Sequence, residues 1–165
     1  MRAGDERIRK AWEVLREVQD PEIPVISVVD LGIVRSIEND AGTLVVSLTP
    51  TYSGCPATKV IEESVDQALN EAGLQPFRIL TVLDPPWSTA MISEEGKQKL
   101  KAYGIAPPEE ESLDKRALSG ETHAVSCPRC GSDHTRMVSQ FGSTPCKAHF
   151  KCLDCLEPFD YFKCL

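Results

Sequence analysis

The chain has 165 residues, of which 41% are hydrophobic and 26% charged, and its net charge is −7. These values are typical of a globular protein with one ordinary domain and a small module. The charge is uneven, because residues 1–120 carry 13 Lys and Arg against 20 Asp and Glu, while residues 121–165 carry 5 of each kind. Neither part has the cationic excess that nucleic-acid binding needs, so we expect no nucleic-acid partner.

The sequence also bears on the compartment. No apolar run approaches the roughly 20 residues that a membrane span needs. The opening "MRAGDERIRKAW" lacks the apolar segment of a secretory signal. We therefore expect a cytoplasmic protein without a membrane partner. The 7 cysteines then indicate metal or redox chemistry, because disulfides are disfavoured in that compartment.

The first elements in chain order are a helix and a hairpin. Apolar residues at helical spacing predict the helix; they are Ile8, Ala11, Trp12, Leu15 and Val18. The two prolines of "DPEIP" at 20–24 end this helix. An extended segment at 32–38 is followed by "NDAG" at 39–42, which predicts a hairpin turn. The second strand, at 44–49, alternates between two faces.

A second helix, a third strand and a third helix follow. The second helix is predicted by one stripe of small and apolar residues: Val60, Ile61, Ser64, Val65, Ala68, Leu69 and Ala72. Gly73 ends it, and "FRILTVL" at 77–83 is the third strand. Ser93 is expected to cap the third helix, and Gly104 to close it.

This order of elements predicts an α+β fold. A helix-strand-strand-helix-strand-helix domain spans residues 1–108 and is large enough for its own core. Residues 109–122, proline-rich and then charged, are interpreted as a linker. Residues 123–165 form a separate module that contains 6 of the cysteines.

Four of these cysteines form two C-x-x-C pairs, in "CPRCG" and "CLDC". They are Cys127 with Cys130 and Cys152 with Cys155, separated by 21 residues, close to the usual spacing of four-cysteine zinc sites. Two thiolates in a tight turn can reach one tetrahedral ion at about 2.3 Å from each sulfur. We therefore predict a zinc ribbon with structural zinc. Iron, alone or in a cluster, is the alternative, because four thiolates suit either metal.

Cys146 and Cys164 flank the second pair. One hypothesis is that they are small buried hydrophobic residues among the aromatic side chains of the module. The other is that they form a second thiol pair, which accepts a metal or takes part in redox exchange. The three histidines are expected to be polar surface residues; they are His123, His134 and His149. The alternative is that His149 is a substitute metal ligand.

The remaining cysteine, Cys55, stands in "SGCP" just ahead of the second predicted helix. Pro56 suits the first helical position, which makes Cys55 the expected N-cap residue. Unpaired N–H groups and the helix dipole there would lower the pKa of the thiol. The first domain contains no histidine to serve as a base, so metal or cluster handling is favoured over nucleophilic catalysis. One cysteine cannot hold a cluster alone, so a second copy of the chain or a partner's cysteine would be needed.

Three segments resemble the small iron–sulfur assembly domain of SufT-like proteins. They are "DPEIPVISVVDLGIV" at 20–34, "LTPTYSGCP" at 48–56 and "DPPWSTAMISEEGKQKLKAYGIAPP" at 84–108. The cysteine module, with "CPRCGS" and "FGSTPCKAHFKCLDCLEPFDYFKC", is similar to that of PaaD-like proteins, accessory proteins of bacterial phenylacetate degradation. The resemblance then covers nearly the whole chain and implies an α+β scaffold fold.

The resemblance also implies a role. PaaD-like proteins accompany the multicomponent oxygenase that epoxidises the ring of phenylacetyl-CoA, so the implied role is maturation or repair of its iron or iron–sulfur centres. By this resemblance, Cys55 would hold or pass on iron or a cluster. Apart from the resemblance, carboxylates of the first domain are candidates to assist it, namely Asp20, Asp30 and Asp84. The implied partners are oxygenase or reductase subunits and the assembly machinery, and a homodimer is a further possibility. An electron-transfer or structural component of the same complex is the alternative, and no independent catalytic activity is expected.

Overall fold

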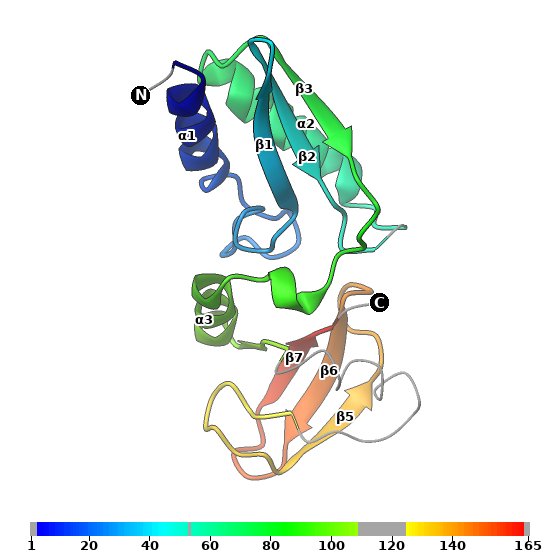
Figure 1. The fold of residues 1–165 in the computed structure, drawn as a ribbon. Helices are drawn as coiled ribbons and strands as arrows, with labels where there is room; N and C mark the ends of the chain where they lie inside the picture. Colours follow the sequence, from blue (N-terminus) through cyan, green and yellow to red (C-terminus); the bar gives the residue numbers. More distant parts are fainter. Residues whose placement is uncertain (1–2, 53, 109–124, 164–165) are drawn as a thin grey trace. The chain divides into compact units, whose positions relative to one another are not determined.

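The computed structural model of the chain describes residues 3–52, 54–108 and 125–163 (Figure 1). Contacts divide the chain into two units, Met1–Trp87 and Ser88–Leu165. Each unit has its own sheet, so each has its own source of stability.

The first unit packs helices against a sheet with the strand order β1-β2-β3. Its elements are α1 (Ala3–Leu15), β1 (Val34–Asp40), β2 (Thr43–Leu48), α2 (Thr58–Glu71) and β3 (Phe77–Thr81). β1 and β2 are antiparallel, in agreement with the predicted hairpin, whereas β2 and β3 are parallel. A parallel pair needs a crossover connection, which α2 supplies. In Figure 1, α2 lies behind the sheet and α1 runs alongside β1.

The predicted apolar stripes form the core of this unit. The buried side chains of α1, β2 and α2 include Ala11, Leu15, Leu44, Val46, Ile61, Val65 and Leu69. Gly73, with φ +68°, follows the end of α2 as predicted. The helical spacing predicts Val18 in the first helix, but α1 ends at Leu15. The reason is tertiary: the carbonyl of Val18 accepts from Val28 N at 2.9 Å, and Gln19 pairs with Ser27.

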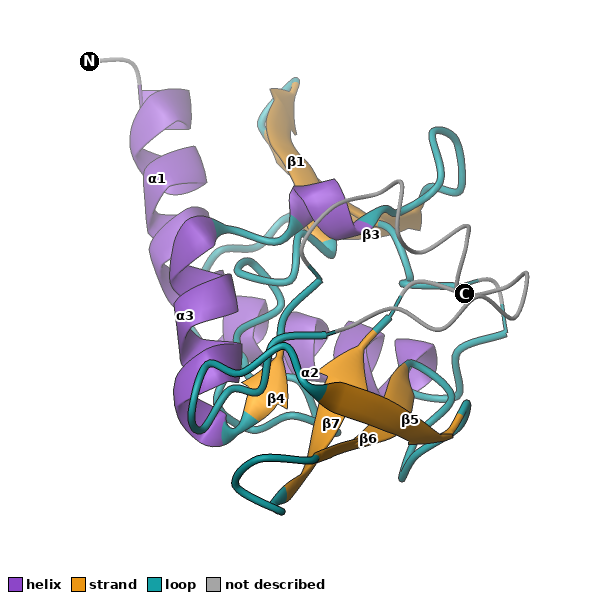
Figure 2. Cartoon of the chain, turned by 90° about the horizontal axis from the view of Figure 1, so that it is seen from below, coloured by secondary structure: helices purple, strands orange, loops and turns teal. Residues whose placement is uncertain are grey.

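The second unit combines helices with the cysteine-rich sheet. Its elements are η1 (Thr89–Met91), α3 (Glu94–Tyr103), β4 (Ile105–Ala106), β5 (Thr135–Ser139), β6 (Lys147–Cys152) and β7 (Pro158–Phe162). The strand order is β4-β7-β6-β5, with β4 parallel to β7 and the other pairs antiparallel. Figure 2 shows α3 next to β4 at one end of this sheet.

Both predicted ends of the third helix are confirmed. Ser93 Oγ accepts a hydrogen bond from Gly96 N at 2.9 Å and so satisfies one of the free N–H groups of the first turn. Gly104 adopts φ +94° at the other end, a left-handed conformation that glycine reaches without a steric penalty.

The α+β fold and the predicted order of elements are confirmed. The units, however, divide after Trp87 rather than at the predicted boundary of residue 108. The physical reason is that β4 pairs with β7, so α3 and β4 associate with the cysteine-rich sheet. The division of the sequence into domains at 1–108 and 123–165 stays a prediction. The predicted linker at 109–122 lies outside the described residues. Within the described ranges, no helix has the length and hydropathy to cross a bilayer.

Candidate metal centre and the Cys55 segment

The structure brings together the four cysteines of the two C-x-x-C pairs. Their sulfur atoms, those of Cys127, Cys130, Cys152 and Cys155, all lie within 4.8 Å of one another. Cys127 Sγ is 3.8 Å from Cys155 Sγ, and Cys130 Sγ is 3.6 Å from Cys152 Sγ. In each pair the first cysteine is buried and the second is exposed. The group is therefore a four-thiol cage with one side open to solvent.

The backbone builds each pair in the same way. In the first, Gly131 N donates to Cys127 O at 2.9 Å, and Gly131, directly after Cys130, has φ +76°. In the second, Leu156 directly follows Cys155 and has φ +65°. A non-glycine residue is uncommon in this region. The repeated positive φ turns the chain back after each pair, so both sulfurs of a pair point into one cage.

Without a cation, the pKa values of the thiols in the cage shift in opposite directions. The backbone N–H of Cys155 faces Cys152 Sγ at 3.5 Å and lowers the pKa of Cys152 to about 7. At Cys155, the N–H of Glu157 lowers the pKa, but desolvation and the three neighbouring thiols together raise it to about 12. Several thiolates this close repel one another. A divalent ion removes that repulsion, and a closed set of four thiolates fits structural zinc.

Asp154 links the two pairs without being a ligand. It lies between Cys152 and Cys155. Its carboxylate accepts a hydrogen bond from Ser132 Oγ, and its Oδ1 lies 3.0 Å from His134 Nδ1. The hydrogen bond from Ser132 and then that from His134 lower the pKa of Asp154. These contacts hold the second pair in register with the first, as groups around a metal site commonly do.

Other polar residues of the module stay outside the cage. His149 Nδ1 lies 3.2 Å from Asp160 Oδ1, and among the described residues the metal-ligating group contains no histidine. Cys146 is buried, and its sulfur lies 3.1 Å from Thr144 Oγ1. Cys164 and His123 lie outside the described residues. The two hypotheses for Cys146 and Cys164 both stay predictions.

Cys55 belongs to the first unit and occupies a different position from the predicted one. The N-cap of α2 is Ala57, two residues later, so the prediction that Cys55 is the cap is wrong. The reason is that turns precede the helix: Cys55 N donates to Tyr52 O and Thr58 N donates to Cys55 O, both at 3.2 Å. Cys55 is partly exposed. Its side chain is therefore accessible at the start of the helix, without capping it.

Asp20 and Asp30 are both buried in the segment between α1 and β1. Asp20 Oδ1 accepts hydrogen bonds from Glu22 N at 2.9 Å and Ile23 N at 2.8 Å, which fixes the turn that follows α1. Asp30 N donates to Ser27 Oγ at 3.0 Å. Within the described residues, Asp20, Asp30 and Cys55 do not form a group with three metal ligands in reach of one another. Any iron on Cys55 would therefore need ligands from outside this group.

Thr49 directly follows β2 and begins the segment that carries Cys55, and no sequence signal marks it. Its side chain is 1% exposed, and Thr49 Oγ1 has no hydrogen-bond partner among the described residues. A buried hydroxyl without a partner costs about 1–3 kcal/mol. No sequence pattern distinguishes such a threonine from a satisfied one, because its environment is built by tertiary contacts.

Replacing this hydroxyl by a methyl group tests the cost. Thr49→Val keeps the shape of the side chain and removes the unsatisfied oxygen, so we expect unchanged or greater stability, by up to about 1 kcal/mol. The measurement is the free energy of unfolding of the first unit in urea. Ser47→Val in β2 is the control, since Ser47 is only partly buried. A Thr49→Val variant that is destabilised by more than about 1 kcal/mol would mean that the hydroxyl has a partner in solution.

Comparison with known proteins places these features in a family. Residues 111–163 match the family described as PaaD zinc beta ribbon domain, and residues 8–74 match that described as iron-sulfur cluster assembly protein. Over 159 residues the chain is 42% identical to an Escherichia coli (strain K12) protein assigned as one of the subunits of 1,2-phenylacetyl-CoA epoxidase, covering 96% of this chain and 94% of that protein. The chain belongs to the PaaD family. The zinc ribbon of this PaaD-family chain is thus supported by both its geometry and its sequence.

Shorter relatives match part of this PaaD-family chain. The chain is 37% identical over 89 residues to the Fe-S protein maturation auxiliary factor of Porphyromonas gingivalis, covering 53% of this chain and 84% of that protein. A crystal structure of a domain of unknown function, DUF59, from Bacillus anthracis has a TM-score of 0.55 at 29% identity, covering 59% of this chain and 94% of that one. This chain therefore combines an iron–sulfur cluster assembly match at 8–74 with a zinc ribbon match at 111–163.

Proposed function

We propose that this chain is an accessory factor that matures or repairs an iron or iron–sulfur centre of a multicomponent phenylacetyl-CoA epoxidase. The observation that carries the proposal is the end-to-end similarity to a protein of that epoxidase, combined with an iron–sulfur assembly match that contains Cys55. An accessory factor of this kind acts on a partner protein and needs no turnover of its own. We place it in the cytoplasm, where thiols stay reduced.

In this proposal the two groups of thiols have different tasks. The four-cysteine cage is closed to further ligands once zinc fills it, so it stabilises the ribbon. Cys55 lies in the other unit, is partly exposed, and is outside the zinc ligand set. Among the described residues, no group of three metal ligands includes Cys55, so iron held there would be bound weakly and released readily. That is the behaviour that transfer to a client requires.

Asp20 and Asp30 assist Cys55 in this proposal. Both carboxyl groups are buried, so a nearby cation would stabilise their charged forms. The remaining ligands to iron come from the client, from the assembly machinery or from a second copy of the chain. The partners are therefore proteins, and a homodimer joined through Cys55 is one form of the proposal.

Metal and sulfide analysis of anaerobically purified, untagged protein tests the proposal. We expect one zinc per chain, lost in Cys152→Ala and retained in Cys55→Ala. We expect iron and sulfide below one equivalent, lost in Cys55→Ala and retained in Cys152→Ala. The absorption spectrum reports the same difference, since zinc–thiolate sites are colourless in the visible range and iron–thiolate sites are not.

The same experiment tests the alternative of an electron-transfer component. That alternative rests on the four thiolates, which suit iron as well as zinc. Stoichiometric iron that disappears with Cys152→Ala and is indifferent to Cys55→Ala would overturn the maturation proposal in favour of electron transfer.

A further inference from the structure

β3 is an edge strand with one side open. Among the described residues of the sheet, β3 pairs with β2 and with no other strand. Leu44 N donates to Pro76 O and Val82 N donates to Leu48 O, so the even-numbered residues of this segment face β2. Because the backbone groups of a strand alternate in direction, Phe77, Ile79 and Thr81 direct their N–H and C=O groups to the open side. A row of backbone donors and acceptors is thus available to another strand.

The open edge is more apolar than edge strands usually are. In "FRILTVL" at 77–83, Arg78 is the one charged residue, and its guanidinium pairs with Asp40 at 2.9 Å. Leu80 is 42% exposed, and Leu83, just past the strand, is 58% exposed. Natural proteins blunt exposed edges with charges, prolines or a covering segment, because such edges recruit other strands. The apolar character of 77–83 therefore favours a binding function for the edge.

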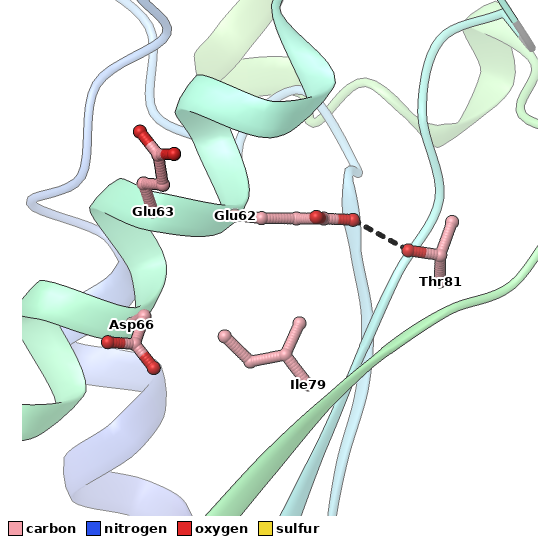
Figure 3. Close-up of a pocket in the computed structure, with 5 residues that line it drawn as sticks. All are labelled: Glu62, Glu63, Asp66, Ile79 and Thr81. Atoms are coloured by element: carbon pink, nitrogen blue, oxygen red, sulfur yellow. Dashed lines mark hydrogen bonds between the residues drawn. The ribbon is translucent and has the colours of Figure 1, made fainter.

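Beside this edge, α2 and β3 enclose a hollow lined with carboxylates (Figure 3). Its volume is about 410 Å³, and Ile79 and Thr81 form the strand side. The helix side consists of Glu62, Glu63 and Asp66. Figure 3 shows Glu62 directed across the hollow to Thr81, whose Oγ1 donates to it at 2.7 Å. Ile79 and Thr81 therefore line the hollow with their side chains and direct their backbone groups to the open edge.

The negative charge of the hollow is poorly compensated. In the part of the chain that the structure describes, one lysine pairs with these carboxylates: Lys59, 3.9 Å from Glu63, with both side chains largely exposed. Asp66 accepts from Asn70 Nδ2 at 2.9 Å, a neutral donor. Glu62 accepts from a hydroxyl group. A partner that brings positive charge would meet an electrostatically complementary surface.

We propose that the β3 edge binds an extended, basic segment of a partner protein as a fourth strand, with Lys or Arg side chains reaching the carboxylates of Glu62, Glu63 and Asp66. Strand addition supplies main-chain hydrogen bonds, and alternate side chains supply the specificity. A strand added at about 4.8 Å from β3 brings long basic side chains within reach of the hollow. Its apolar side chains contact Leu80 on the other face of the sheet.

Charge also decides between this occupant and a second copy of the chain. Pairing β3 with β3 of another copy would bring two sets of carboxylates to the same junction, and like charges there are destabilising. A basic partner removes that repulsion, whereas a second copy doubles it. The proposal is independent of metal on Cys55, since none of its residues is a metal ligand.

Binding of a synthetic probe to the full, zinc-loaded chain tests the proposal. The probe is the fluorescein-labelled heptapeptide Val-Lys-Val-Lys-Val-Lys-Val, measured by fluorescence anisotropy at low salt. We expect Glu62→Gln with Asp66→Asn to weaken binding about tenfold, because two carboxylates are removed in a low-salt solution. Glu6→Gln with Glu17→Gln removes as much charge from exposed positions elsewhere on the first unit and should leave binding unchanged.

A second probe separates strand addition from simple charge attraction. The same heptapeptide N-methylated at its central residues keeps its charge and lacks backbone donors, so we expect at least a tenfold loss of affinity. Equal binding of the methylated and unmethylated peptides, equal weakening by the control variant, or no binding at millimolar peptide would each overturn the proposal. A dimer of the free chain that the peptide dissociates would overturn it in favour of a second copy. None of these outcomes depends on the iron content of the protein. A failure of the strand-binding proposal can therefore be distinguished from a failure of the proposed maturation function.

Discussion

Removal of zinc is expected to unfold Ser88–Leu165, including α3, and to leave Met1–Trp87 folded. In zinc-finger peptides, structural zinc contributes about 10–16 kcal/mol of apparent binding free energy, which acts as folding free energy. We expect a loss of this order in the second unit, far more than a single side chain contributes.

The core of the second unit explains this dependence on zinc. The cluster contains Ala106, Val125, Cys127, Ala148, Phe150, Cys152, Phe159 and Tyr161. Two of its members, Cys127 and Cys152, are zinc ligands that are 0% exposed. Without the metal, weak thiol–thiol contacts of 3.6–3.8 Å replace the metal–sulfur bonds that join these two cysteines to the exposed pair, Cys130 and Cys155. A core this small does not compensate for the loss of those bonds and for the entropy of ordering the unit.

Hydrogen exchange measured by mass spectrometry checks the prediction for each element. Peptides from α3, β6 and β7 of the Cys152→Ala variant should lose protection together, while those from α1, β2 and α2 should keep it. Cys146→Ala is the matched control, because Cys146 is buried in the same unit but lies outside the four-cysteine group. If α3 kept its protection while β6 and β7 lost theirs, α3 would belong energetically with the first unit, as the predicted boundary at residue 108 implies.

Local signals in the sequence are sufficient for several elements. Ser93 and Gly104 define the ends of α3 through hydrogen bonds and backbone angles of single residues, so both could be predicted. The turn between β1 and β2 has the same local origin. The cysteine cage was also predictable, because two C-x-x-C pairs need one ion to satisfy them.

Features that depend on distant contacts could not be obtained in this way. The two residues of β4, Ile105 and Ala106, carry no strand pattern and are extended because β7 pairs with them. The predicted cap at Cys55 is wrong by two residues, since the turns before α2 depend on Tyr52 O and Cys55 O as acceptors. Thr49 is distinguished by its buried hydroxyl, which lacks a hydrogen-bond partner among the described residues, and the sequence does not show this. In each of these positions the tertiary environment overrides the local preference.

The second large effect is expected from Cys55→Ser. This variant keeps a small polar side chain at a partly exposed position, so the fold and the zinc content should not change. If Cys55 carries iron to its client, the loss of its thiolate should lower iron incorporation into the co-expressed epoxidase about tenfold or more, as loss of a group at a metal site commonly does. The measurement is the iron content of the purified oxygenase, together with its epoxidase activity.

Asp20 allows the chemical role of its charge to be separated from its structural role. Asp20→Asn retains a carbonyl oxygen that can accept the hydrogen bonds from Glu22 N and Ile23 N, but it removes the negative charge. If the charge assists iron on Cys55, Asp20→Asn should lower iron incorporation with the fold intact, whereas Asp20→Ala should also lower the stability of the first unit. For the Cys55→Ser prediction, Cys146→Ser is the control for loss of a thiol as such. Full iron incorporation with Cys55→Ser, or an equal defect with Cys146→Ser, would remove Cys55 from the proposed transfer step.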